Sequence, residues 1–140
     1  LLRDVQYVRE REAVNKFLYH LARDTGMAVY GEEEVRKMLV IGAVETLLLS
    51  EELRRVRIRY RCRACGAEGS VSVEGDGEVK CEKCGAADVE VVDKTPVIEE
   101  LAKLAERSGA EVVLVSTQTS EGRELYRVFG GVAAILRFKV

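Results

Sequence analysis

Four cysteines form two matched pairs in the middle of this 140-residue sequence. The segments RCRACG and KCEKCG follow a C-x2-C-x15-C-x2-C pattern and hold Cys62, Cys65, Cys81 and Cys84. Two residues between the members of a pair allow one tight turn to direct both sulfur atoms at one ion, and this spacing is typical of zinc sites. The glycines after each pair, Gly66 and Gly85, give the backbone the freedom that such a turn requires.

These cysteines predict one structural Zn²⁺ per chain. Four thiolates complete a tetrahedral coordination shell and leave no position for water or substrate. Two disulfides, four ordinary thiols and a thioredoxin-like redox pair are the alternative interpretations. Two matched pairs that flank a hairpin fit one metal ion better than two redox centres. We expect the ion to stabilise a ribbon of roughly 35 residues with almost no apolar core of its own.

A ladder of arginines leads into the first cysteine pair. The residues Val56, Ile58 and Tyr60 alternate with arginines, which predicts a strand with one basic face. The ladder comprises Arg54, Arg55, Arg57, Arg59, Arg61 and Arg63. Arg57, Arg59, Arg61 and Arg63 are candidate contacts for RNA phosphates, which would be salt-sensitive and blind to sequence. The alternative is a solvated face that discourages edge pairing, partly neutralised by nearby acidic residues.

Other chemistry has little support in the sequence. His20, the only histidine, lies beside the apolar stripe of a predicted helix and is expected to be a partly exposed structural residue. The sequence has no G-x-S-x-G, P-loop, H-E-x-x-H or G-x-G-x-x-G motif, and no carboxylate pair can be placed across a cleft. We therefore expect no catalytic residues and no enzymatic activity.

Elements on either side of the cysteines alternate between helix and strand. Helices are predicted over 3–24 and 121–129. Two more are predicted to begin at Glu32 and at Thr95-Pro96. The predicted strands include 27–30, 44–50, the run EVVLVST, expected to be buried on both faces, and VAAILRF. The fold class is therefore α/β, a layered sandwich around a mixed sheet. It is expected to comprise 1–56 and 92–140, with an inserted zinc-ribbon minidomain at 57–91.

Composition narrows the class of protein further. The chain is 47% hydrophobic and 33% charged with a net charge of −2, so it is expected to be globular and not an electrostatic nucleic-acid binder as a whole. No apolar run reaches the roughly 18 residues of a membrane span, and Leu1 and Leu2 open no signal pattern. We expect a cytoplasmic protein with no membrane partner. Because the sequence does not begin with Met, a fragment of a longer protein is also expected.

Two long stretches resemble a known family. They are LARDTGMAVYGEEEVRKMLVIGAVETLLLSEEL (21–53) and VSTQTSEGRELYRVFGGVAAILRF (115–138). Both resemble the C-terminal domain of the archaeal and eukaryotic class-one peptide chain release factor, and the cysteine segment falls where archaeal members carry a zinc minidomain. The resemblance implies a fold similar to the kink-turn-binding ribosomal proteins. A related ribosome-rescue factor shares motifs resembling YGEEEV and GAVETLLLS but usually lacks the zinc insert.

The resemblance also implies partners. Such a domain docks an elongation-factor-like translational GTPase and later the ribosome-recycling ATPase, on the ribosome. The family's stop-codon-reading and Gly-Gly-Gln domains are absent from this sequence, since Gly130-Gly131 is followed by Val132. The family's terminal Gly-Ile-Leu-Arg-Tyr motif appears here as AILRF, which makes Arg137 and Phe138 candidate partner-binding residues without the tyrosine hydroxyl.

Two other functions stay open at this point. One is a free-standing RNA-binding module of the kink-turn-binding ribosomal-protein fold, which would need a basic loop at one end of the sandwich. The other is a metal-dependent enzyme, which would need a metal with a vacant coordination position that four cysteines do not leave. Within the AILRF segment, at least one of Ile135 and Leu136 is expected to be a core residue.

Overall fold

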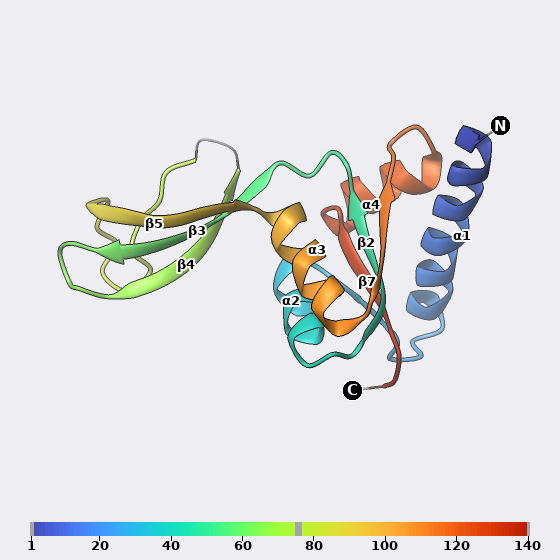
Figure 1. Cartoon of the computed structure of the whole chain (residues 1–140), viewed down its shortest axis with the longest axis horizontal. Coiled ribbons are helices and arrows are strands. Elements are labelled where there is room, and N and C mark those ends of the chain that lie inside the picture. The colour runs from blue at the N-terminus through green and yellow to red at the C-terminus, as the bar shows by residue number, and fades with distance from the viewer. Residues whose placement is uncertain (1, 75–76, 140) are drawn as a thin grey trace. The chain divides into compact units, whose positions relative to one another are not determined.

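The computed structural model describes residues 2–74 and 77–139 (Figure 1). The chain forms two compact units. The first comprises Leu1–Leu53 and Leu101–Val140, and the second is Arg54–Glu100. The predicted limits of the zinc-ribbon minidomain, residues 57 and 91, stay a prediction. Among the described residues, no helix is both long and apolar enough to cross a membrane.

The first unit is an α/β domain with a mixed four-stranded sheet. Its strands are β1 (Ala28–Tyr30), β2 (Val44–Ser50), β6 (Glu111–Val115) and β7 (Val132–Leu136). The strand order is β1-β7-β2-β6, in which β2 and β6 are parallel and the other two pairs are antiparallel. The predicted α/β class and mixed sheet are confirmed.

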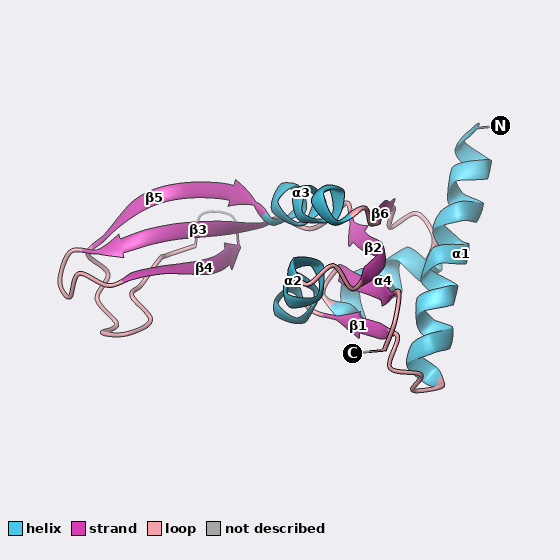
Figure 2. Ribbon diagram, turned by 60° about the horizontal axis from the view of Figure 1, so that its bottom comes forward, coloured by secondary structure: helices cyan, strands magenta, loops and turns pink. Residues whose placement is uncertain are grey.

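Helices cover both faces of this sheet (Figures 1 and 2). The helices are α1 (Leu2–Ala22), α2 (Glu32–Val40), α3 (Val97–Ser108) and α4 (Ser120–Phe129). α1 and α4 lie on one face, and α2 and α3 lie on the other. Thr119 caps α4 by accepting the Gly122 N–H, and Gly130 ends that helix in the left-handed conformation. α3 begins at Val97 because Pro96 still pairs with Val56 in a strand.

One apolar cluster fills the space between α1, α4 and the sheet. Val14 and Phe17 of α1 pack there with Leu48, Leu125 and residues of β6 and β7. The first turns of α1 are different, because Val5 is 66% exposed and Val8 is 49% exposed. A helix of 21 residues is about 31 Å long, whereas strands of five to seven residues span about 17–23 Å. The helix therefore extends beyond the strands that it covers.

The prediction that EVVLVST is buried on both faces is wrong. β6 is the last strand in the order of the sheet, and β2 is its only strand partner among the described residues. Val113 and Val115 face the apolar cluster, whereas Val112 and Leu114 are 36% and 47% exposed. An apolar run indicates burial of a strand but cannot show that only one of its faces is covered.

The second unit is a three-stranded antiparallel sheet that carries the cysteines. Its strands are β3 (Arg55–Cys62), β4 (Glu68–Glu74) and β5 (Val89–Pro96), in the order β4-β3-β5. A small buried cluster of Tyr60, Cys62 and Cys81 packs against five partly buried apolar side chains. The core of this unit is much smaller than that of the first.

Candidate metal centre

The two cysteine pairs lie on equivalent tight turns. The Cys62 carbonyl accepts the Gly66 N–H at 2.9 Å, and the Cys81 carbonyl accepts the Gly85 N–H at 2.8 Å. Gly66 and Gly85 both have a φ of 75°, a conformation that a residue with a Cβ rarely adopts. The N–H of each first cysteine is also bonded, to Ala67 O and Ala86 O. The backbone therefore repeats the same turn at both pairs.

These turns bring four sulfur atoms together. All four Sγ atoms lie within 4.8 Å of one another. Cys62 Sγ lies 3.6 Å from Cys84 Sγ, and Cys65 Sγ lies 3.7 Å from Cys81 Sγ. A tetrahedron of sulfurs about 2.3 Å from a zinc ion has edges of about 3.8 Å, whereas a disulfide needs about 2.05 Å. All four cysteines are free, and their arrangement fits a metal ion.

Backbone donors surround these sulfur atoms. The N–H of Cys65 donates to Cys62 Sγ at 3.4 Å. The N–H groups of Cys84 and Lys83 donate to Cys81, and the Cys84 donor makes the largest contribution that lowers the pKa of the Cys81 thiol to about 6. Cys62 and Cys81 are buried, whereas Cys65 and Cys84 are exposed. The cluster is therefore supplied with donors suited to thiolate ligands.

The buried Tyr60 supports the turn that holds the second pair. Its hydroxyl oxygen accepts the N–H of Glu82 at 3.0 Å. Gly69 lies opposite Tyr60 on the neighbouring strand, and a Cβ there would lie 2.7 Å from the tyrosine hydroxyl oxygen. The close approach of the ring to the β4 backbone thus requires glycine. In the sequence Tyr60 belongs only to the alternating pattern, which gives no sign of this role.

Acidic partners engage much of the arginine ladder. Arg61 pairs with Glu68 at 2.9 Å, and Arg63 pairs with Asp88 at 3.1 Å. The Arg57 side chain donates to the Ser72 hydroxyl at 3.2 Å. Arg59 is exposed, and its side chain has no hydrogen bond or ion pair within the part of the chain that the structure describes. The role of these four arginines in RNA contact stays a prediction.

The two candidate partner-binding residues near the end of the chain differ from each other. The Arg137 side chain donates to the carbonyls of Val44 and Ser108, both at 2.9 Å. Phe138 is 52% exposed. Ile135 and Leu136 are buried, as expected for core strand residues. Arg137 thus has a structural anchor, Phe138 is accessible, and partner binding by either residue stays a prediction.

His20 is partly exposed and locally bonded. Its Nδ1 lies 3.0 Å from Thr25 Oγ1, and its ring contacts Tyr19 edge-on. These contacts connect the end of α1 with the loop that follows. They fit the expected structural role.

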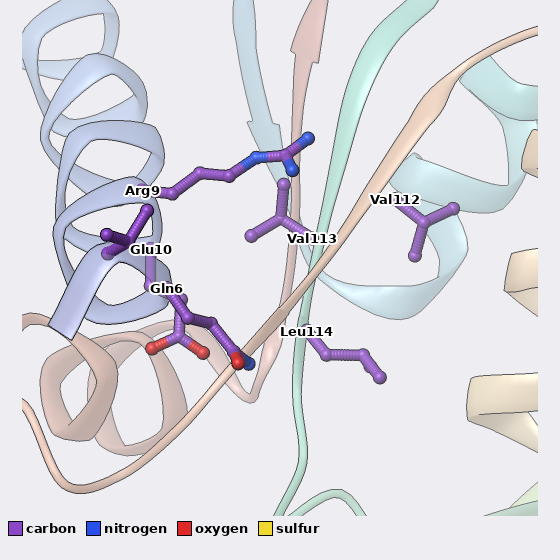
Figure 3. A pocket seen from close by; sticks show the side chains of 7 residues that line it. Gln6, Arg9, Glu10, Val112, Val113 and Leu114 are labelled. Atoms are coloured by element: carbon purple, nitrogen blue, oxygen red, sulfur yellow. The ribbon is translucent and has the colours of Figure 1, made fainter. Parts of the chain in front are cut away.

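One buried acid, Glu10 of α1, was not predicted from the sequence. Only 2% of the residue is exposed, and it lines a cavity of about 470 Å³ between α1 and β6 (Figure 3). Burial raises the pKa of Glu10, Glu51 raises it further, and the Ser116 N–H and Gln6 lower it in part. The sequence RER at 9–11 did not indicate that Glu10 is buried, because a charged residue on a helix is ordinarily solvated.

The sheet and the cysteine turns together define a class of protein: an α/β domain with a second sheet that carries a four-cysteine cluster. Residues 7–140 match the family described as eRF1 domain 3. The chain belongs to this family, the C-terminal domain of the archaeal peptide chain release factor. This finding confirms the resemblance predicted from sequence.

The similar proteins share this domain. The chain is 47% identical over 147 residues to peptide chain release factor subunit 1 of Pyrococcus abyssi, and 48% identical over 141 residues to that of Archaeoglobus fulgidus. These matches cover 100% and 99% of the chain but only 35% and 34% of the relatives. The chain therefore spans about a third of their length. A solved C-terminal domain of the peptide chain release factor from Methanosarcina mazei is 40% identical, with a TM-score of 0.87 over 99% of this chain and 88% of that one.

More distant structures share the fold over part of their length. Dom34 of S. cerevisiae, a termination-like factor described as interacting with Hbs1, is 26% identical with a TM-score of 0.64 over 99% of this chain and 30% of that one. A ribosome-bound archaeal Pelota, described together with ABCE1, is 30% identical with a TM-score of 0.57 over 99% of this chain and 29% of that one.

Proposed function

We propose that the chain is the non-catalytic, partner-binding domain of a translation termination factor. The observation that carries this proposal is the family match over residues 7–140, together with 40–48% identity to archaeal release factors and their C-terminal domain. Stop-codon reading and peptidyl-tRNA hydrolysis would belong to other domains of the whole protein. A ribosome-rescue factor is the second candidate, supported by the structural likeness to Dom34 and Pelota.

The proposed partners are an elongation-factor-like translational GTPase, the ribosome-recycling ATPase and the ribosome. Support comes from the related structures, because Dom34 is described as interacting with Hbs1 and an archaeal Pelota is described as ribosome-bound with ABCE1. The exposed Phe138 is the side chain from the terminal motif that can reach a partner. Arg137 would act by holding that end of the chain in place.

Binding of the GTPase tests this function. Isothermal titration of this chain with the translational GTPase of an archaeal relative should give a saturable complex. Phe138→Ala should weaken it, because an exposed aromatic side chain is a typical interface anchor. Val91→Ala is the matched control, since Val91 is 51% exposed and lies in the other unit. No complex at any accessible concentration, or equal losses in both variants, would contradict the proposal.

The proposed cofactor is one structural Zn²⁺ held by Cys62, Cys65, Cys81 and Cys84. The sulfur separations of 3.6 and 3.7 Å and the free state of the four thiols support it. The ion would supply a cross-link between the two turns. Elemental analysis of the purified chain should give one zinc per molecule. Two disulfides in an intact-mass measurement, or protein without metal, would contradict this assignment.

Arg59 is proposed to contact RNA phosphates or an acidic partner on the ribosome, because its side chain is exposed and has no ion pair within the described residues. Arg59→Gln should weaken ribosome binding and reduce the slope of log affinity against log salt by up to about one unit. Arg61→Gln is the control, since Glu68 already neutralises Arg61 and its loss should matter less. Unchanged affinity and slope for Arg59→Gln would show that Arg59 belongs to a solvated face.

A further inference from the structure

The outer edge of β6 offers unpaired backbone groups beside α1. The Val115 carbonyl accepts the Glu51 N–H, so the backbone groups of Val115 face β2. Successive residues of a strand direct these groups to opposite sides. The N–H and C=O of Val112 and Leu114 therefore face the outer edge, and no strand pairs with that edge among the described residues.

A cavity of about 470 Å³ lies along this edge. Val5, Gln6, Arg9 and Glu10 of α1 form one wall, and residues 112–114 form the other. Figure 3 shows Val113 directed toward the helix, whereas Val112 and Leu114 point away from it. Val5, Val112 and Leu114 are all exposed apolar side chains. We call this site the β6-edge groove.

Glu10 is the unusual residue of the β6-edge groove. Its Oε1 accepts the Ser116 N–H at 3.3 Å, just beyond the end of β6. Its Oε2 is buried and has no hydrogen-bond partner within the described part of the chain. A buried acceptor without a donor is costly, and more so when it is charged. Gln6 lies close enough to lower the pKa of Glu10, but no donor with hydrogen-bond geometry reaches Oε2. Oε2 thus lacks a donor that a bound molecule can supply.

The charges around Glu10 favour a cationic donor. Coulombic repulsion from Glu51 raises the pKa of Glu10, and a nearby positive charge would oppose this effect. Arg9, which lines the groove, forms an ion pair with Glu111 at the start of β6. A lysine or arginine side chain would donate a hydrogen bond to Oε2 and neutralise the carboxylate of Glu10.

We propose that the β6-edge groove binds an extended segment of a partner protein, which pairs with β6 and places a lysine or arginine against Oε2 of Glu10. Side chains of the added strand alternate between the two faces of the sheet. The basic residue would point toward α1, and its neighbours would extend the exposed apolar face of Val112 and Leu114. The partner segment would therefore have an apolar–basic–apolar sequence and would bind as an additional strand of the sheet. This inference does not depend on the proposed role in termination.

The test is a selection with peptides of defined length. A phage library of ten-residue peptides is selected on this chain and counter-selected on Glu10→Gln. This substitution is not expected to unfold the chain, because the amide oxygen of glutamine can still accept the Ser116 N–H. Peptides with a lysine or arginine between apolar residues should be enriched. Enrichment of peptides without a basic residue, or of none, would overturn the proposal.

An enriched peptide is then measured in solution against three forms of the chain. Its affinity should fall about 10- to 100-fold for Glu10→Gln, the loss expected for a charge-assisted hydrogen bond. It should be unchanged for Glu12→Gln, an exposed acid on the same helix. Amide signals of Val112, Leu114 and Ser116 should shift on binding. Equal affinity for all three forms, or shifts confined to other elements, would overturn the proposal.

The free chain supplies two further outcomes. If the Leu114 amide signal shifts with protein concentration, a second copy of the chain occupies the edge, and the proposed partner is wrong. If the Leu114 amide is protected from hydrogen exchange before peptide is added, the chain's own residues cover the edge, which also overturns the proposal. We expect a concentration-independent spectrum and rapid exchange at this amide.

Discussion

The two units of this chain stabilise their sheets by different means. In the first, apolar side chains from helices and strands exclude water from a large core, and Phe17 and Leu48 are completely buried. In the second, the buried cluster consists of one tyrosine and two cysteines with partly buried neighbours. A sheet with so little apolar burial needs a cross-link, and four clustered thiols provide the ligands for one. We therefore expect that either unit can be unfolded, by loss of its apolar core or of its proposed metal ion, while the other stays folded.

Removal of the proposed zinc ion should have the largest effect. Structural zinc supplies about 10–16 kcal/mol of apparent binding free energy in small domains, which is more than a core of this size can replace. A chelator, or Cys81→Ser, should therefore unfold residues 54–100 and leave the four-stranded sheet folded. Hydrogen exchange measured residue by residue distinguishes the two units. Unfolding of both units together would show that the first depends on the second.

The converse experiment is a cavity in the first unit. Phe17 is fully buried and contacts the Phe129 ring edge-on, with 5.1 Å between ring centroids. Phe17→Ala should lower the free energy of unfolding of this unit by about 3–5 kcal/mol. Tyr19→Ala, at a side chain 51% exposed on the same helix, is the control. Denaturant melts give the stability, and the zinc content of Phe17→Ala should stay at one per chain. Loss of zinc in that variant would contradict independent units.

A smaller effect is expected at Tyr60. Tyr60→Phe keeps the buried ring but removes the oxygen that accepts the Glu82 N–H. The unpaired donor should cost about 1–3 kcal/mol, and the cost should appear as weaker metal retention. Competition with a chelator measures this loss, with Tyr7→Phe as the control on α1. Equal metal affinity in the two variants would mean that water replaces the lost acceptor.

The cysteine spacing predicted the second unit well because its chemistry is local. Each turn needs only two cysteines three positions apart and a following glycine, and both turns formed as expected. The contact between the two turns joins residues that are far apart in the sequence. It was nevertheless predictable, because two matched pairs of thiols suggest that all four bind one ion. The alternation in β3 was equally local, since Ile58, Tyr60 and Cys62 are all buried.

Burial in the first unit was harder to predict because it depends on which strands become neighbours. The composition of β6 indicated a central strand, yet its position at the edge exposes Val112 and Leu114. Apolar residues continue along α1 as far as Val5, but Val5 is exposed because the sheet beneath the helix is shorter than the helix. Glu10 was unpredictable for the same reason, since only tertiary contact with Ser116 shows that this acid is buried.

The smallest predicted effect is a dependence of stability on pH that arises from Glu10. Burial raises its pKa in the folded chain above the ordinary value of 4.5, so the folded state binds the proton more tightly than the unfolded state. Stability should fall as pH rises from about 4.5 through the folded pKa and then level off. The groups that set this pKa are Glu51, which raises it, and the Ser116 N–H and Gln6, which lower it.

Glu10→Gln isolates this contribution because it cannot ionise and keeps an acceptor for Ser116. The free energy of unfolding of the wild-type chain minus that of the variant should become more negative across this pH range. The measurement must follow the first unit alone, by denaturant-dependent exchange of the Leu48 and Ala133 amides. Thiols that hold the proposed zinc ion in the second unit would exchange it for protons as pH falls. A difference that does not change with pH would mean that a bound water already donates to Oε2 or that a bound cation already neutralises the carboxylate. In that case the β6-edge groove would have no need of a basic side chain.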